Sequence, residues 1–177
     1  MTLVVEVEMK NYKPAKPPYT EFYRIIGVKP SKSLEEKIIL QPSRRGLRII
    51  VLNPKETQQI AKALREKQEK IKIRKIESID KHIEKILKKL SGNLGEKIIV
   101  KTRTPAKTTL PQTLEIAKKI NAEKTEVKKV GKNLYNIKYE ITLTQKNLHE
   151  ALKLIIYGIG KQKHQGYGTT IWKQLKL

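Results

Sequence analysis

Apolar and polar residues alternate along the first part of the chain in the way that half-buried β-strands require. The alternation over residues 3–9 predicts a strand, and residues 72–79 show the same pattern with one register break. Two apolar runs, residues 37–41 and 47–52, flank a short basic turn. Such runs are typical of a β-hairpin, so four strands are predicted before residue 80.

Two helices are predicted between these strands from the residues at their ends. Thr20 suits the cap of a short helix that Gly27 ends. Asn53 and Pro54 suit the cap and the first position of a second helix, whose apolar residues share one face. The predicted order over residues 1–79 is therefore strand, helix, strand, strand, helix, strand.

The second half of the chain repeats this order after a helix that begins at Asp80. The apolar residues of that helix recur at helical spacing, and we interpret it as a connector. The predicted strands after it are residues 97–101, 123–130, 134–143 and 169–175, and the predicted helices begin after Pro111 and at Asn147.

This element order indicates the fold class. A split β-α-β unit of this kind is the ferredoxin-like fold, in which two helices cover one face of a four-stranded antiparallel sheet, as in RNA-recognition motifs. We therefore predict an α+β protein with two tandem ferredoxin-like (βαββαβ) domains, residues 1–79 and 96–177, joined by a connector helix at residues 80–95.

The charge of the chain points to a polyanionic partner. Lys and Arg number 39 against 17 Asp and Glu, which gives a formal net charge of +22. A compact chain with this excess repels itself, so nucleic acid is the expected partner and an acidic membrane surface the second choice. Lys-rich surfaces also occur in thermophilic proteins, but those surfaces usually carry matching Glu.

Composition also argues against several classes of protein. The chain has no Cys, which excludes disulfides and Cys-ligated zinc. Its apolar runs fall short of the roughly 20 residues that a membrane span requires. The N-terminal residues form a charged alternating pattern and not a signal peptide, so a cytoplasmic location without membrane contact is expected. The sequence shows no carboxylate cluster typical of a two-metal nuclease.

The segment over residues 158–168 carries the most specific pattern. It lies between a predicted helix and a predicted strand, and its glycines and basic residues are Gly158, Gly160, Gly166, Gly168, Lys161, Lys163 and His164. Glycine permits left-handed backbone and close approach of a ligand, and consecutive N–H groups can hold an anion. We interpret the loop as a clamp for an RNA phosphate backbone, with a flexible connector as the alternative. The spacing of a P-loop is absent.

Two further basic clusters are candidates for RNA contact. They are Arg44, Arg45 and Arg48 at the predicted hairpin, and Lys101, Arg103 and Lys107 on either side of Pro105. Arginine suits phosphate and can stack on bases, whereas a merely charged turn is the alternative for the hairpin. No predicted strand carries the aromatic pair with which RNA-recognition motifs stack bases.

The four glycines of this loop have the spacing GxGxxxxxGxG, which resembles the signature of the RAMP superfamily of CRISPR-associated proteins. With two tandem ferredoxin-like units, the chain looks most like the endoribonucleases that cut CRISPR repeat RNA into guide crRNAs. The resemblance implies cleavage without a metal ion or other cofactor, by attack of a 2′-hydroxyl that leaves a 2′,3′-cyclic phosphate. It implies RNA as the partner, and leaves open other CRISPR-associated subunits and a homodimer.

The resemblance also suggests where acid–base groups would lie. Relatives often place a His near the first helix, but this sequence has none before His82. The remaining candidates around that helix are Tyr19, Tyr23, Arg24 and Lys29. Tyr has an ordinary pKa of about 10, so slow turnover is expected. The alternative is that these tyrosines and Phe22 form the buried face of the helix.

The histidines leave two questions open. His82 and His149 lie among charged residues and are predicted to face solvent. His164 lies in the loop, where it is expected to contact a phosphate, with an acid–base role as the alternative. Beside the endoribonuclease, two hypotheses remain: a non-catalytic RAMP subunit that holds guide RNA in an effector complex, and a ribosomal or general RNA-binding protein.

Overall fold

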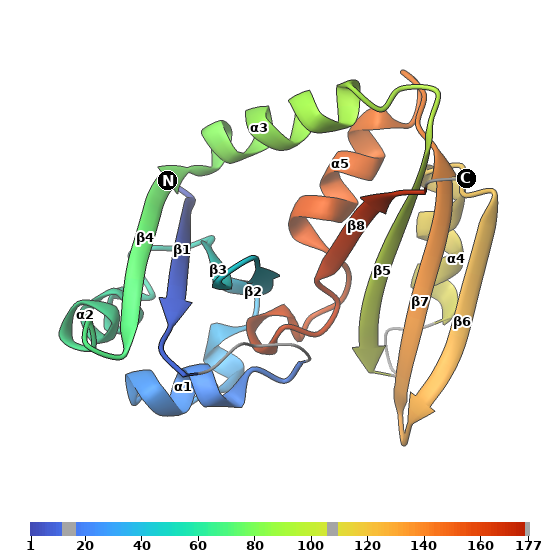
Figure 1. The fold of residues 1–177 in the computed structure, drawn as a ribbon. Helices are drawn as coiled ribbons and strands as arrows, with labels where there is room; N and C mark the ends of the chain where they lie inside the picture. The colour runs from blue at the N-terminus through green and yellow to red at the C-terminus, as the bar shows by residue number, and fades with distance from the viewer. Residues whose placement is uncertain (12–16, 106–109, 176–177) are drawn as a thin grey trace. The chain divides into compact units, whose positions relative to one another are not determined.

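The computed structural model describes residues 1–11, 17–105 and 110–175. These residues form two four-stranded antiparallel sheets and five α-helices, which agrees with the predicted α+β class and is compatible with two ferredoxin-like units (Figure 1). The chain divides into one unit of Met1–His82 with Lys161–Gly166, and a second of Ile83–Gly160 with Tyr167–Leu177. The middle of the glycine-rich loop therefore belongs to the first unit, whereas the sequence had assigned the whole loop to the second.

The first sheet brings together strands from both ends of the first unit. Its strands are β1 (Leu3–Met9), β2 (Ile38–Ser43), β3 (Gly46–Val51) and β4 (Ile71–Ser78), in the order β2-β3-β1-β4. All four were predicted to within two residues at either end. Register shifts between Glu6 and Val7 where β1 pairs with β4, so the break expected from the sequence is a β-bulge.

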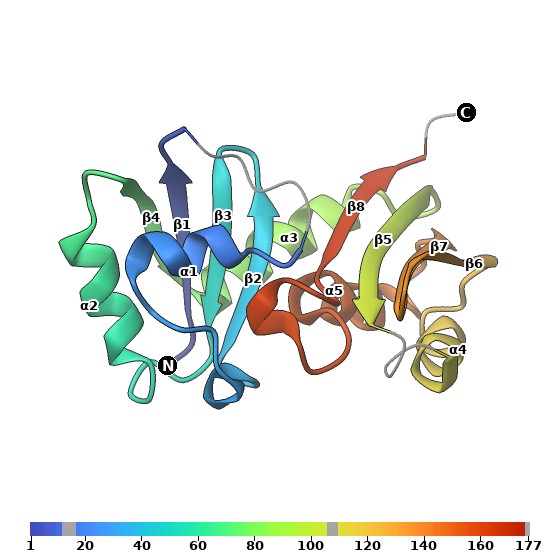
Figure 2. The ribbon, with the colours of Figure 1, turned by 90° about the horizontal axis from the view of Figure 1, so that it is seen from below.

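Two helices cover one face of this sheet, α1 (Thr20–Ile26) and α2 (Gln58–Glu66) (Figure 2). A short 3-10 helix, η1 (Lys32–Leu34), precedes β2. The core between sheet and helices includes Val5, Val7, Leu40, Ile49, Phe22, Tyr23, Ile60 and Leu64. Burial of this apolar surface, at about 25 cal/mol per Å², is the main stabilising contribution to the unit.

The predicted starts of both helices need correction. Thr20 is the first helical residue of α1, not its cap, whereas Gly27 ends the helix in a left-handed conformation as expected. The Asn53 side chain accepts a hydrogen bond from the Glu56 N–H, but the residues that follow form turns and α2 begins only at Gln58. Asn53 therefore caps a turn, as its position suggested, but the α-helix itself begins about one turn later than predicted.

The second sheet has the same strand order as the first. Its strands are β5 (Lys97–Pro105), β6 (Lys124–Gly131), β7 (Leu134–Thr142) and β8 (Thr170–Gln174), in the order β6-β7-β5-β8. The sequence predicted that β5 ends at Lys101, before Thr104 and Pro105. The strand instead continues to Pro105, which pairs with Leu134. Proline is tolerated there because the strand ends at that residue.

Two helices of the second unit lie on the same face of this sheet, α4 (Leu110–Lys119) and α5 (Leu148–Tyr157) (Figure 2). The Tyr139 hydroxyl donates to the carbonyl oxygen of Thr113 in α4 at 3.2 Å. The Thr170 hydroxyl bonds to the carbonyl oxygens of Leu154 and Ile155 in α5. The register puts Tyr139 and Thr170 on one face of the sheet, so both helices cover that face.

Helix α3 (Ile79–Ser91) contains the division between the two units. It carries a buried stripe of His82, Ile86 and Leu90, one turn apart. The prediction that His82 faces solvent is therefore wrong, because the apolar spacing of the helix extends back to position 82. Its Nδ1 lies 3.8 Å from a carboxylate oxygen of Glu77. His149 is exposed, as predicted.

Candidate nucleic-acid interface

The stem of the glycine-rich loop is closed by backbone hydrogen bonds. The Ile159 N–H donates to the Gly168 carbonyl oxygen at 2.8 Å, and the Gly168 N–H donates to that of Arg103, also at 2.8 Å. Gly158 and Gly168 both have positive φ, at 67° and 78°. A Cβ on Gly158 would overlap the carbonyl of Gly168, and a Cβ on Gly168 would overlap that of Ile159. Glycine is therefore required here by the close approach of two backbone segments.

The middle of the loop packs on the first helix of the first unit. Its residues Lys163–Gln165 form a 3-10 helix, η3. The Tyr19 N–H donates to the Gln165 carbonyl oxygen at 3.0 Å, and the Tyr23 hydroxyl donates to the His164 carbonyl oxygen at 2.5 Å. The Tyr19 ring occupies the place where a Cβ on Gly166 would lie. Both tyrosines therefore hold the loop in place.

These contacts change the interpretation of the glycines. The N–H groups of Gly158, Ile159, Gln165, Gly166 and Gly168 all donate to carbonyl oxygens of the protein. They do not form the anion-binding loop that the sequence suggested, because each already has an internal acceptor. Gly160 does have the expected positive φ, at 84°. The cations of the loop are therefore its remaining candidates for phosphate contact.

The proposed catalytic tyrosines lie in the core. Tyr19 and Tyr23 are 2% and 1% exposed, and Phe22 beside them is 0% exposed. Burial raises the pKa of Tyr23, which disfavours the phenolate form that a base requires. The alternative interpretation, in which Tyr19, Phe22 and Tyr23 form the buried face of the helix, is therefore confirmed. Arg24 and Lys29 are exposed, and Arg24 pairs with Glu21.

His164 is not placed for the phosphate contact expected of it. Its side chain is buried, with 3% of the residue exposed, and its imidazole bonds to the backbone of Lys161. Within the described part of the chain, its Nδ1 has no hydrogen-bond partner. Burial lowers the pKa of His164 against the opposing effect of Glu35, which favours the neutral imidazole. A buried neutral ring contributes no charge to an RNA-binding surface.

The two lysines of the loop differ in environment. Lys161 is exposed, whereas Lys163 is half-buried. Burial lowers the pKa of Lys163, and the nearby Glu36 carboxylate opposes this shift. Glu36 has a φ of 63°, an unusual left-handed conformation for a residue of this type. Lys163 therefore loses its proton more readily than an ordinary lysine. Lys161 is exposed and accessible to a phosphate ligand.

A basic hollow lies beside the hairpin of β2 and β3. It has a volume of about 430 Å³ and is lined by Ser43, Arg44, Arg45, Arg48, Arg74 and Lys75, with Glu6 and Val7. Arg44 and Arg45 are exposed at the turn, as the sequence predicted. Arg48 is half-buried and binds the Glu6 carboxylate at 3.0 Å. We call this site the hairpin hollow.

Sequence reasoning missed two cations of the hairpin hollow. Arg74 and Lys75 come from β4, which is distant in sequence from the hairpin but pairs with β1. The register aligns Arg48, Glu6 and Lys75 across three neighbouring strands. The β-bulge in β4 allows Arg74 and Lys75, although adjacent in the chain, to line the same hollow. The bulge was visible in the sequence as a register break, but the neighbouring strand was not.

The third predicted basic cluster is only partly described. Lys101 is exposed on β5, and Arg103 is half-buried and donates from Nε to the Asn136 side-chain oxygen at 2.8 Å. Lys107 lies outside the residues that the structure describes. Both described cations lie in the second unit.

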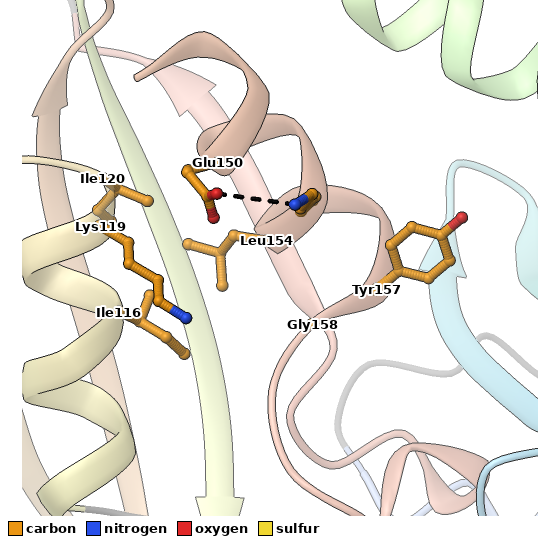
Figure 3. A pocket seen from close by; sticks show the side chains of 8 residues that line it. Ile116, Lys119, Ile120, Glu150, Leu154, Tyr157 and Gly158 are labelled. Carbon is orange, nitrogen blue, oxygen red and sulfur yellow. Dashed lines mark ion pairs between the residues drawn. The ribbon is translucent and has the colours of Figure 1, made fainter. Parts of the chain in front are cut away.

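A second hollow, of about 300 Å³, lies between α4 and α5 (Figure 3). Ile116, Ile120 and Leu154 form its apolar part, and Tyr157 and Gly158 lie where α5 leads into the loop. Glu150 pairs with Lys153 beside it at 3.7 Å. This hollow is lined by fewer cationic side chains than the hairpin hollow, and part of its lining is apolar. It is therefore less suited to bind RNA phosphates.

No helix in the described part of the chain is long and apolar enough to cross a membrane. The sequence matches no protein-family model and has no significant match among curated proteins.

Proposed function

We propose that this protein is a RAMP-type protein of two ferredoxin-like units that binds CRISPR repeat RNA. The hairpin hollow carries the proposal, because five cationic side chains line it. Arg48, Arg74 and Lys75 are paired with Glu6, Glu8 and Glu77, respectively. Arg44 and Arg45 are exposed at the turn and are the cations most accessible to RNA. Phosphate groups of RNA are the ligands that such a site suits, and arginine forks bind them in pairs. The order of strands, the same in both sheets, and the glycine spacing of the loop support the RAMP assignment.

The exposed arginines of the hairpin allow a direct test of RNA binding. We expect Arg44→Ala with Arg45→Ala to weaken binding of CRISPR repeat RNA about tenfold, since two charge-assisted contacts are lost. The slope of log affinity against log salt should fall by about 1.4, because each single-strand phosphate contact contributes about 0.7. Fluorescence anisotropy over a salt series measures both quantities.

The matched control removes two cations from the helix-covered side of the same unit. Lys62→Ala with Arg65→Ala changes the net charge equally, and both residues are exposed on α2. This control should bind RNA nearly as the parent protein does. If both double variants lose the same affinity and slope, the hairpin hollow is not an RNA site and only net charge matters.

We further propose that Lys163 is the base of a metal-independent cleavage. In its neutral form, Lys163 would take the proton of the 2′-hydroxyl while that oxygen attacks the adjacent phosphate. Its half-buried position and lowered pKa make the neutral form more accessible than for an exposed lysine. As the bond from the 2′-oxygen to phosphorus forms, the bond from phosphorus to the 5′-oxygen breaks, and the leaving oxygen takes a proton from water. The products are a 2′,3′-cyclic phosphate and a 5′-hydroxyl. Lys161, exposed two residues earlier, would bind the charged phosphate.

A conservative exchange separates these two roles. We expect Lys163→Arg to keep RNA binding but to lose cleavage by about a hundredfold or more, because a guanidinium stays protonated. Lys161→Arg should keep both activities. Cleavage by the parent protein should rise with pH toward the lowered pKa of Lys163. The assay uses repeat RNA in EDTA, and full activity of Lys163→Arg would reject the role of Lys163.

The same assay tests the second candidate function. The burial of Tyr19 and Tyr23 favours a non-catalytic subunit that holds guide RNA beside other CRISPR-associated proteins, because it removes two catalytic candidates. A parent protein that binds repeat RNA tightly but leaves it intact, with and without magnesium, would establish this second function over cleavage.

A further inference from the structure

One face of the second sheet remains uncovered by its helices. Val100 and Thr102 of β5 pair with Trp172 and Thr170 of β8 on the face that α4 and α5 cover. Lys101 alternates with them and lies on the other face. Figure 2 shows both helices on one side of this sheet. We call the opposite side the open face; Ile99 on it is 5% exposed, whereas Ile171 is 58% exposed and Lys101 is also exposed.

The register arranges the residues of the open face in rows across the strands. One row contains Ile171, Lys101, Lys138 and Glu126, a second contains Lys173, Ile99, Glu140 and Lys124, and a third contains Arg103, Asn136 and Lys128. Neighbouring strands are about 4.8 Å apart, so each row brings together side chains that are distant in sequence. This grouping cannot be seen from any continuous segment of the sequence, because it depends on which strands pair.

Cations dominate this face after its ion pairs are considered. Glu126 interacts with Lys124 at 3.1 Å and with Lys138 at 3.9 Å, and Lys138 is also 3.9 Å from Glu140. Both carboxylates of the rows are therefore already engaged, toward β6 and β7. Lys101 and Lys173 are exposed on β5 and β8, on the side of the sheet away from Glu126. Their ammonium groups are therefore accessible to a partner from outside the sheet.

An exposed apolar side chain lies among these cations. Ile171 is 58% exposed and pairs directly with Lys101 across β5 and β8. An exposed isoleucine between lysines offers apolar contact to a sugar or a base, while the lysines hold phosphates. The rows contain no aromatic residue, so base stacking on this face is not expected.

We propose that the open face binds single-stranded RNA as a sequence-tolerant track for its phosphate backbone. Charge complementarity selects a polyanion, and the exposed Ile171 selects a strand whose bases are accessible, since a duplex keeps its bases stacked inside. The inference rests on the proposed RNA-binding function. It adds a second RNA-binding surface to the hairpin hollow, and it specifies that this surface binds a single-stranded segment of the RNA.

Charge reversal on the open face tests this inference. We expect Lys101→Glu with Lys173→Glu to weaken binding of an unstructured oligouridine of about 20 nucleotides at least tenfold. The slope of log affinity against log salt should fall by about 1.4, because two phosphate contacts are lost. Binding of a duplex RNA of the same length should change much less.

The matched control is Lys118→Glu with Lys146→Glu. Both lysines are exposed in the same unit, on α4 and just before α5, and the change in net charge is identical. The control should retain most of its affinity for oligouridine. Ile171→Ala should weaken single-strand binding a few-fold and leave duplex binding unchanged, because its apolar contact requires unstacked bases. Circular dichroism confirms that each variant is folded before its affinity is compared.

The outcomes distinguish this inference from the proposed function. Equal losses for the open-face variant and its control would overturn the inference, and so would equal losses for oligouridine and duplex RNA. If the hairpin variants still weakened binding of repeat RNA in that case, the proposed function would stand without the open face. A parent protein with no affinity for any RNA would overturn both.

Discussion

Gly168→Ala is expected to destabilise the protein by about 3 kcal/mol. Left-handed backbone costs a residue with a Cβ about 1 kcal/mol, and forced repacking costs about 1–3 kcal/mol more. Gly168 has a φ of 78°, and its missing Cβ would overlap the Ile159 carbonyl, which is backbone and cannot turn away. The Gly168 carbonyl and N–H both take part in closing the loop, so displacement would also strain two hydrogen bonds.

A second glycine of the same unit provides the control. Gly95 has a φ of 84°, and a Cβ there would meet nothing within 4 Å. Gly95→Ala should therefore cost only about 1 kcal/mol, the price of the left-handed conformation. Urea unfolding gives the free energy of both variants, provided that the slope m is unchanged. Equal destabilisation would show that backbone conformation alone, and not the close approach of Ile159, requires glycine at position 168.

Substitution of the loop glycines is also expected to affect RNA binding. The sequence predicts that a large side chain at Gly160 or Gly166 abolishes binding, through obstruction of a phosphate. At Gly166 the obstruction is instead the Tyr19 ring, so a substitution there would displace the loop itself. Loss of binding by such a variant counts for the phosphate clamp only if the loop remains folded. Lys161, exposed and not part of this packing, is the cleaner position for that test.

Local sequence patterns predicted most of the strands and helices. The alternation over Leu3–Met9 predicted both ends of β1 correctly. It did so because the apolar side chains on the helix-covered face of this strand pack in the core. The turn of the β2–β3 hairpin is equally local. The start of α2 was misplaced because a cap signal specifies the first turn and not whether that turn is α-helical.

Long-range pairing limited the prediction of the site. Arg74 and Lys75 join the hairpin hollow only because β4 pairs with β1, and a single sequence does not specify which strands are neighbours. Lys101 and Lys173 are likewise distant in sequence. They lie on one face only because β5 pairs with β8. Tyr19 and Tyr23 illustrate a different error. The family resemblance suggested acid–base groups around the first helix, where the alternative of a buried apolar face is what the structure shows.

The sequence identified the glycine-rich loop and suggested that its backbone N–H groups bind a phosphate. Several of these N–H groups instead donate to carbonyl oxygens of the protein. Glycine spacing indicates where backbone segments approach closely, and it does not show whether the neighbour is a ligand or the protein. In this chain the neighbours are Ile159, Gly168 and the Tyr19 ring. The glycines thus build the loop, and the functional hypothesis moves to the lysines that this backbone presents.

Tyr23 should prove essential for stability and dispensable for chemistry. We expect Tyr23→Ala to cost about 3–5 kcal/mol, as for other large aromatic side chains removed from a core, because the ring is 1% exposed. Tyr23→Phe keeps the ring and loses only the hydrogen bond to the His164 carbonyl, which should cost about 1–2 kcal/mol. Urea unfolding at neutral pH measures both free energies.

Tyr139→Phe is the matched control for Tyr23→Phe. Tyr139 is equally buried, and its hydroxyl also donates to a backbone carbonyl, that of Thr113 in the second unit. Both Phe variants should lose similar stability, but only Tyr23→Phe should loosen η3, which hydrogen exchange of the loop amides detects. Below the unfolding temperature, Tyr23→Phe should cut repeat RNA within a few-fold of the parent rate. A hundredfold loss would return Tyr23 to the catalytic site only if the η3 amides exchange as in the parent, because η3 carries the proposed base Lys163.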